Sequence, residues 1–176
     1  KNTMMKYFAF ALLAASGLVF SACGNKAKDL EELKTYLAGA YGQQATDTLV
    51  TLLRENPGGP NSTDYALLLA AAYEEKMQDT ISAISVYQAV VMAHPGSDAA
   101  QTAAARIPGD SPSLTERIEK LQAEVFDPRT VMSNAKKIGS YLNSCIAHVL
   151  LLPKDTLSST LLNKAAENAY YTQQYD

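Results

Sequence analysis

The feature that most constrains the fold of this chain is a spacing that occurs in two adjoining segments. In the first segment the intervals are nine, four, three and five, through Tyr36, Ala45, Leu49, Leu52 and Pro57. In the second they are ten, four, three and five, through Tyr73, Ala83, Tyr87, Val90 and Pro95. Steps of three and four return to one face of an α-helix, and proline ends a helix. The spacing therefore predicts pairs of helices in tandem, with the second helix of each pair ending before a proline.

The remainder of the chain also favours helices over strands. Alanine is abundant, and no segment shows the alternation of apolar and polar residues that a half-buried strand requires. We therefore predict an all-α fold. The expected helices cover residues 29–41, 44–55, 64–76, 79–93, 98–107, 114–126 and 128–152, with a last helix from about 156. Gly42 is expected to break the chain between the first two helices.

Two helix starts carry specific signals. Ser97 is a good N-cap for the fifth helix, and Ser113 and Glu116 have the spacing of a capping box. The helix over 128–152 carries an apolar stripe in steps of four and three. Its residues are Val131, Ala135, Ile138, Leu142, Cys145, Val149 and Leu152. We expect this stripe to face the core.

The segment "DYALLLAAAYEEKMQDTISAISVYQAVVMAHP" resembles a tetratricopeptide repeat (TPR), a family of antiparallel helix pairs. Ala70 and Tyr73 match the first helix of that repeat, and Ala83, Tyr87 and Pro95 match the second. The segment departs from the family by one extra residue between the helices and by a valine where alanine is usual. The resemblance implies a TPR-like α-α superhelix over residues 29–176. The alternative is a non-repetitive helical bundle.

The last residues, "LLNKAAENAYYTQQYD", look like the first helix of a further TPR unit. A single helix of a solenoid cannot bury its apolar face without a partner. We therefore expect the helical domain to be truncated at its C-terminal end.

The N-terminal segment predicts export and lipid attachment. Lys1 and Lys6 precede an apolar run over residues 7–20, which is shorter than a membrane-spanning helix needs. The following "FSAC" resembles the lipobox of bacterial lipoproteins, although Phe20 stands where an aliphatic residue is commoner. The resemblance implies a signal peptide over residues 1–22, a lipid on Cys23, and a tether over 23–28. A plain secretory signal with an incidental cysteine is the alternative.

The lipobox resemblance also implies a location. Gly24 stands where an aspartate would mark retention in the inner membrane, so we expect an outer-membrane anchor facing the periplasm, with surface display left open. The chain has 15 basic and 18 acidic residues, a net charge of −3, which is a poor match for nucleic acid. The membrane, reached through the lipid on Cys23, and another envelope protein or peptide are the expected partners.

Residue patterns that carry chemistry are few. Cys145 and His148 could supply half of a structural zinc site, but no second Cys/His pair exists in the sequence. We expect a buried, inert cysteine beside a histidine at a helix end. The glycines of "NPGGPN" lack the lysine and hydroxyl residue of a phosphate loop. We therefore predict no cofactor, no metal, no catalytic residue and no evident small-molecule substrate.

These observations predict a function in binding. A membrane-anchored lipoprotein with TPR-like hairpins would be a non-catalytic protein-interaction scaffold of the cell envelope, of the barrel-assembly or envelope-coordination type. Its partner would contact the inner face of the hairpins between residues 29 and 95. The alternatives are an accessory lipoprotein for nutrient or glycan capture, and the N-terminal helical part of a larger envelope enzyme.

Overall fold

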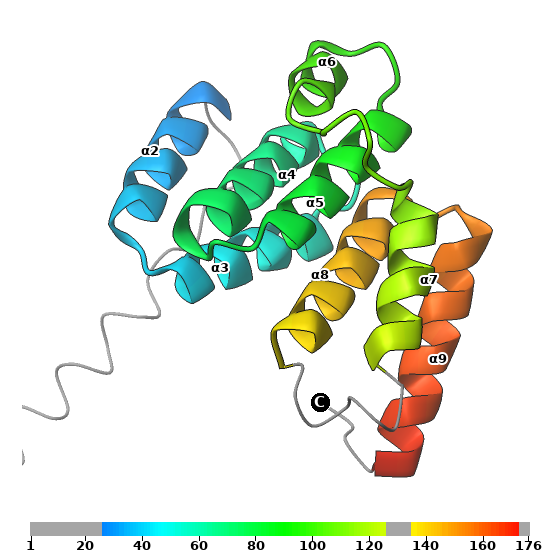
Figure 1. Ribbon diagram of the computed structural model, residues 1–176. Helices are drawn as coiled ribbons and strands as arrows, with labels where there is room; N and C mark the ends of the chain where they lie inside the picture. Colours follow the sequence, from blue (N-terminus) through cyan, green and yellow to red (C-terminus); the bar gives the residue numbers. More distant parts are fainter. Residues whose placement is uncertain (1–25, 126–134, 173–176) are drawn as a thin grey trace, which may run out of the picture. The chain divides into compact units, whose positions relative to one another are not determined.

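The computed structural model describes the backbone of residues 26–125 and 135–172 and the side chains of residues 29–125 and 136–164 (Figure 1). Every regular element of these residues is a helix, which confirms the all-α prediction. The chain divides into two compact units, residues 1–39 and 40–176. The predicted signal peptide and Cys23 lie outside the described residues.

The first unit contains helix α2 (Lys26–Gly39). Leu33 and Leu37 are buried, as their helical spacing predicts. Lys34 and Glu31 form an exposed ion pair one turn apart, with Nζ and Oε1 separated by 2.8 Å. The first predicted hairpin would join α2 to the helix that follows it in the second unit, and it stays a prediction.

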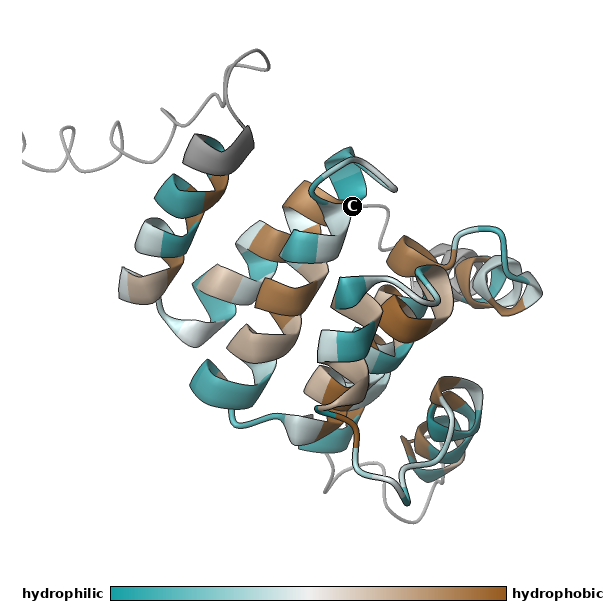
Figure 2. Cartoon of the chain, turned by 90° about the horizontal axis from the view of Figure 1, so that it is seen from above, coloured by the Kyte–Doolittle hydropathy of each residue, from teal (hydrophilic) through white to brown (hydrophobic). Residues whose placement is uncertain are grey.

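The second unit is built from successive helices joined by short turns. Its elements are α3 (Gly42–Glu55), α4 (Ser62–Ala71), the π-helical turn η1 (Ala72–Lys76), α5 (Thr80–Ala93), α6 (Asp98–Ala104), α7 (Leu114–Val125), α8 (Ala135–Leu151) and α9 (Thr156–Thr172). Helix α3 packs on α4, and α4 packs on α5. Helix α8 contacts α5 and also α7 and α9 (Figure 1). Figure 2 shows that hydrophobic and hydrophilic residues occur together on these helices.

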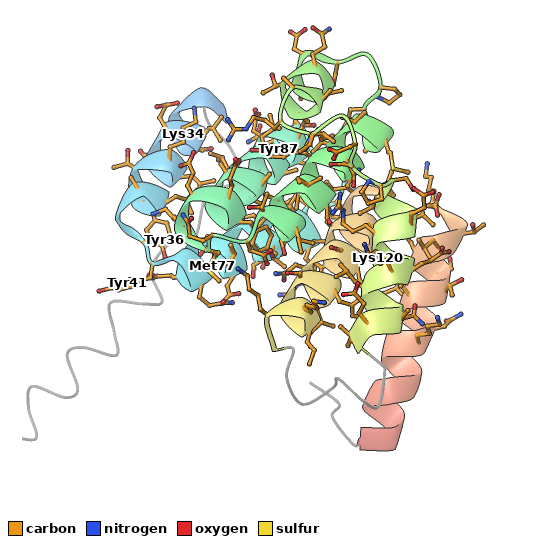
Figure 3. All side chains as sticks on the ribbon, in the orientation of Figure 1. Lys34, Tyr36, Tyr41, Met77, Tyr87 and Lys120 are labelled. Carbon is orange, nitrogen blue, oxygen red and sulfur yellow. The ribbon has the colours of Figure 1, made fainter. Side chains whose placement is uncertain are left out.

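The hairpin of α4, η1 and α5 has small residues and tyrosines in its core. Ala70 and Ala83 are 0% and 1% exposed, and Tyr73 and Tyr87 are 3% and 5% exposed. Small residues let two helix backbones approach closely, and the aromatic rings fill the space beside them. Burial is the main cause that raises the pKa of the Tyr87 phenol above its ordinary value. Figure 3 labels Tyr87 on α5.

Gly42 does not end a helix, contrary to the sequence prediction, because it is the first residue of α3. A Cβ built on Gly42 would lie 2.6 Å from Sδ of Met77 and 3.1 Å from the Lys76 carbonyl oxygen. The absent side chain therefore lets the end of η1 approach the start of α3. The Lys76 ammonium donates a hydrogen bond to the Ala40 carbonyl at 2.9 Å in the same region.

Both predicted helix starts are confirmed. The Ser97 hydroxyl accepts a hydrogen bond from the Ala100 N–H at 3.1 Å and caps α6. At α7 the Ser113 N–H donates to the Glu116 carboxylate at 2.8 Å, and the Glu116 N–H donates to the Ser113 hydroxyl at 3.3 Å. These two bonds are the reciprocal pair of a capping box. The Ser113 N–H and the Ser113 hydroxyl both donate to the Glu116 carboxylate, and these two bonds hold the pKa of that carboxyl below its ordinary value.

The predicted apolar stripe on α8 does not face the core as a whole. Leu142 is 51% exposed, and Cys145 is only partly buried. Val131 lies outside the described residues. The buried residues of α8 instead include Ser140, Ser144, Ala147 and His148. Ser140 and Ser144 contact Asp79 and Ser85, and their small side chains let α8 approach α5 closely. Larger side chains of α8, those of Tyr141 and His148, are buried as well.

Serines of α5 and α8 meet in this contact. The hydroxyl oxygens of Ser85 and Ser144 lie 2.7 Å apart, and both residues are fully buried. Asp79, the N-cap of α5, accepts hydrogen bonds from the hydroxyl of Ser82 at 2.6 Å and from that of Ser140 at 3.0 Å. A buried carboxylate is tolerated only when it is hydrogen-bonded. The α5–α8 contact therefore depends on a satisfied polar network.

Candidate functional site

The residues that sequence reasoning singled out for chemistry lie on α8. Cys145 is free and partly buried, and burial raises the pKa of its thiol above the ordinary value. A raised pKa lowers the fraction of reactive thiolate at neutral pH. His148 is 1% exposed. Within the described residues no cluster of three or more His, Cys, Asp or Glu side chains could hold a metal ion.

The structure places two residues beside His148 that sequence reasoning did not identify. The Nδ1 atom of His148 lies 2.8 Å from the Ser158 hydroxyl oxygen, and Nε2 lies 3.6 Å from Oδ1 of Asp155. Both partners come from the turn and first residues of α9. The sequence offered one local signal for this site, because Asp155 lies just before a helix start, where N-cap residues occur. In the structure its carboxylate accepts a hydrogen bond from the Leu157 N–H at 2.8 Å.

A serine, a histidine and an aspartate in contact invite comparison with a hydrolase triad, but their burial gives them a structural role. Ser158 is 0% exposed, so its hydroxyl cannot reach a substrate carbonyl. Its hydroxyl instead donates a hydrogen bond to the Leu152 carbonyl at 2.7 Å. The three side chains thereby tie the end of α8 to the start of α9 and fix the turn between them.

This turn forms one wall of a cleft with a volume of about 590 Å³. The cleft is enclosed by three chain segments: the turn between α3 and α4, the end of α5, and the turn between α8 and α9. The lining residues are Pro57, Gly58, Ser62, Met92, Ala93, His94, Leu150, Leu151, Leu152, Pro153, Lys154 and Asp155. The size falls within the range of small-molecule sites, about 300–1,000 Å³.

The walls of the cleft are held in place by turn hydrogen bonds. Gly58 adopts a positive φ of 68°, which a residue without Cβ tolerates at no steric cost. The Gly59 N–H donates to the Asn56 carbonyl at 3.0 Å, and the Ser97 N–H donates to the His94 carbonyl at 3.2 Å. The Asp155 N–H donates to the Leu152 carbonyl at 3.0 Å. Hydrogen bonds therefore fix the backbone of the three segments, and the side chains that line the cleft come from these segments.

Most lining side chains are apolar, and the polar ones are Ser62, His94, Lys154 and Asp155. The cleft lies between α-helix ends of one unit and was not identifiable from the sequence. Among the described helices none is long and apolar enough to cross a membrane. No protein-family model, curated protein or solved structure matches this chain.

Proposed function

We propose that this protein is a lipid-anchored, non-catalytic scaffold of the bacterial cell envelope. In this proposal the chain is cut before Cys23, Cys23 carries the lipid, and TPR-like hairpins after it hold an envelope protein or peptide. The anchor is expected at the outer membrane, facing the periplasm.

The observation that carries the proposal is the core of the α4–η1–α5 hairpin. Ala70, Tyr73, Ala83 and Tyr87, the residues that match the TPR pattern, are all at most 5% exposed. Small residues at the helix crossing and aromatic residues beside them are what a repeat of this kind needs. The packing of α3 on α4 and of α4 on α5 also agrees with a stack of helices.

A stack of this kind binds partners through area and a few anchor residues. A lipid on Cys23 would confine it to a membrane surface, where a high effective concentration lets a weak contact suffice. Asp64 and Glu75 lie on the α4–η1 segment and are both exposed, so they offer attachment points for a probe on the first helix of the hairpin.

Site-specific photocrosslinking in intact cells tests the proposal. A photoreactive residue at Asp64 or Glu75 should capture one or a few envelope proteins, which mass spectrometry would identify. The matched control is the same residue at Lys120, an exposed position of α7 that Figure 3 labels. Capture should be stronger from the two α4–η1 positions than from Lys120.

Two outcomes would contradict the proposal. Equal capture from all three positions would mean that the hairpin is not the contact surface. Capture at background level, together with turnover of a substrate by the purified protein, would favour an enzyme.

A further inference from the structure

The π-helical turn η1, which follows α4, is wider than the end of an ordinary α-helix. In an α-helix each N–H donates to the carbonyl four residues earlier. At the end of η1 the Met77 N–H instead donates to the Ala72 carbonyl, five residues earlier, at 3.1 Å. A hydrogen-bonded ring of this π type encloses one residue more than the ring of an α-helix. Figure 3 labels Met77, the donor of this bond.

The cap that ends η1 is wider by one residue as well. Gln78 has a positive φ of 52°, the left-handed conformation in which many helices end. In the Schellman form of such an end, the N–H that follows the left-handed residue donates to the carbonyl five residues earlier. Here that N–H belongs to Asp79, and it donates to the Tyr73 carbonyl, six residues earlier, at 2.9 Å. Both hydrogen bonds at this helix end therefore enclose one residue more than their ordinary counterparts.

The sequence has an additional residue in the same interval. The spacing from Tyr36 to Ala45 is nine residues, whereas the spacing from Tyr73 to Ala83 is ten. Tyr73 and Ala83 are nevertheless both in the core, with 3% and 1% of their surface exposed. The wide turn therefore accommodates the extra residue while the residues on either side of it stay buried.

We propose that η1 is a one-residue insertion that acts as an adapter between the two helices of the hairpin. The two wide hydrogen-bonded rings hold the inserted residue, so α5 packs on α4 as it would after an ordinary helix end. The comparison of spacings rests on the repeat pattern of the proposed function, whereas the two hydrogen bonds do not. One residue can therefore be removed from η1 while both donor–acceptor pairs are kept.

Deletion of Glu75 tests this adapter directly. Glu75 is exposed and lies between the donor and the acceptor of both hydrogen bonds. Without it the Met77 N–H reaches the Ala72 carbonyl as an α-helical bond, and the Asp79 N–H reaches the Tyr73 carbonyl as a Schellman bond. We expect the deletion variant to keep its helix content and to melt within about 4 °C of the wild type.

Deletion of Glu119 is the matched control, because Glu119 is an exposed glutamate in the interior of the regular helix α7. It removes the same residue type, but it turns the two parts of α7 relative to each other by about 100°. Ile118 and Leu121, which are 1% and 5% exposed, can then no longer face the core together. This variant should melt at least about 10 °C below the wild type or lose its cooperative transition. Circular dichroism during thermal unfolding measures both deletions.

A substitution at Gln78 tests the left-handed helix end without any deletion. Glycine adopts a positive φ at no steric cost, so Gln78→Gly should raise the melting temperature by about 1–4 °C. This gain is expected although the variant gives up the exposed hydrogen bond from the Gln78 side chain to the Glu75 carbonyl. Gln101→Gly, at an exposed position inside α6, is the control and should lower the melting temperature, since glycine weakens a helix interior.

Two outcomes would overturn the proposal. A Glu75 deletion that melts more than about 4 °C below the wild type would show that the residue is an integral part of the helix end. A Gln78→Gly variant that is less stable than the wild type would remove the left-handed end. Neither outcome affects the proposed capture of an envelope partner, which crosslinking measures separately.

Discussion

His148 shows how burial of one residue links folding to pH. Its imidazole is 1% exposed, and burial holds its pKa below the ordinary value of 6.5. The nearby Asp155 carboxylate acts in the opposite direction and offsets only part of this effect. Because the native pKa is lower than the unfolded one, the unfolded chain takes up a proton more readily. The stabilising contribution of neutral His148 is present above about pH 6.5 and is lost as pH falls through the native pKa.

We therefore expect His148→Gln to remove part of the acid sensitivity of folding. The free energy of unfolding of the wild type should fall below about pH 6.5 with a contribution from His148 of at most about 1.4 kcal/mol per pH unit. Urea unfolding from pH 5 to 8 would measure it. The difference between wild type and His148→Gln should shrink toward acid pH. His94→Gln, which keeps His148, is the control, and a difference that stays constant with pH would refute the linkage.

At the scale of the helices, the crossing of α4 and α5 requires a small residue on α5. Ala83 on α5 is 1% exposed, whereas Ala99 near the start of α6 is only partly buried. Ala83→Leu should overpack the crossing and cost about 1–3 kcal/mol. Ala99→Leu makes the same chemical change and should cost clearly less. Thermal unfolding of the two variants gives the comparison, and equal shifts would argue against a close crossing at Ala83.

The contact between α5 and α8 also contains small residues, and there they are polar. Ser85 and Ser144 are fully buried, and each also donates to a carbonyl four residues earlier, at 2.9 Å and 2.7 Å. The two hydroxyl groups have only two hydrogens, but they take part in three short oxygen–oxygen contacts: one to each carbonyl and one between the two hydroxyls. Serine is small enough for the close approach and satisfies its own hydroxyl within its helix, so the two helices can pack without a buried unpaired group.

At the scale of the whole protein, Cys23 would decide where the helical domain works. One acyl chain holds a protein to a bilayer only marginally, and two or three chains hold it firmly. If the lipobox interpretation is right, Cys23→Ser leaves an unprocessed precursor without lipid. Intact mass and detergent partitioning of the wild type and the variant would measure this. A wild-type protein that loses residues 1–22 and partitions into the aqueous phase would disprove the lipid anchor.

Local patterns predicted the elements well because helices depend on short-range physics. The period of the apolar residues and the caps at Ser97 and Ser113 indicated the helices and two of their starts. These signals act between residues three or four positions apart, so they are visible in the sequence. Gly42 was assigned to the break between the first two helices, but the non-helical residues are 40 and 41 and α3 begins at Gly42.

What the sequence determined by itself was the all-α class and the positions of most helices. Only the tertiary structure decided which face of α8 is buried, since Ser140 and Ser144 face α5 while Leu142 is 51% exposed. It also brought Ser158 and Asp155 to His148, and it assembled a cleft from three turns that lie far apart in the chain. The physical reason is that the hydropathy of a residue, which is read from the sequence, measures only the free energy of exposing that residue to water. Close packing and hydrogen bonding depend on partners that the chain meets only after it has folded.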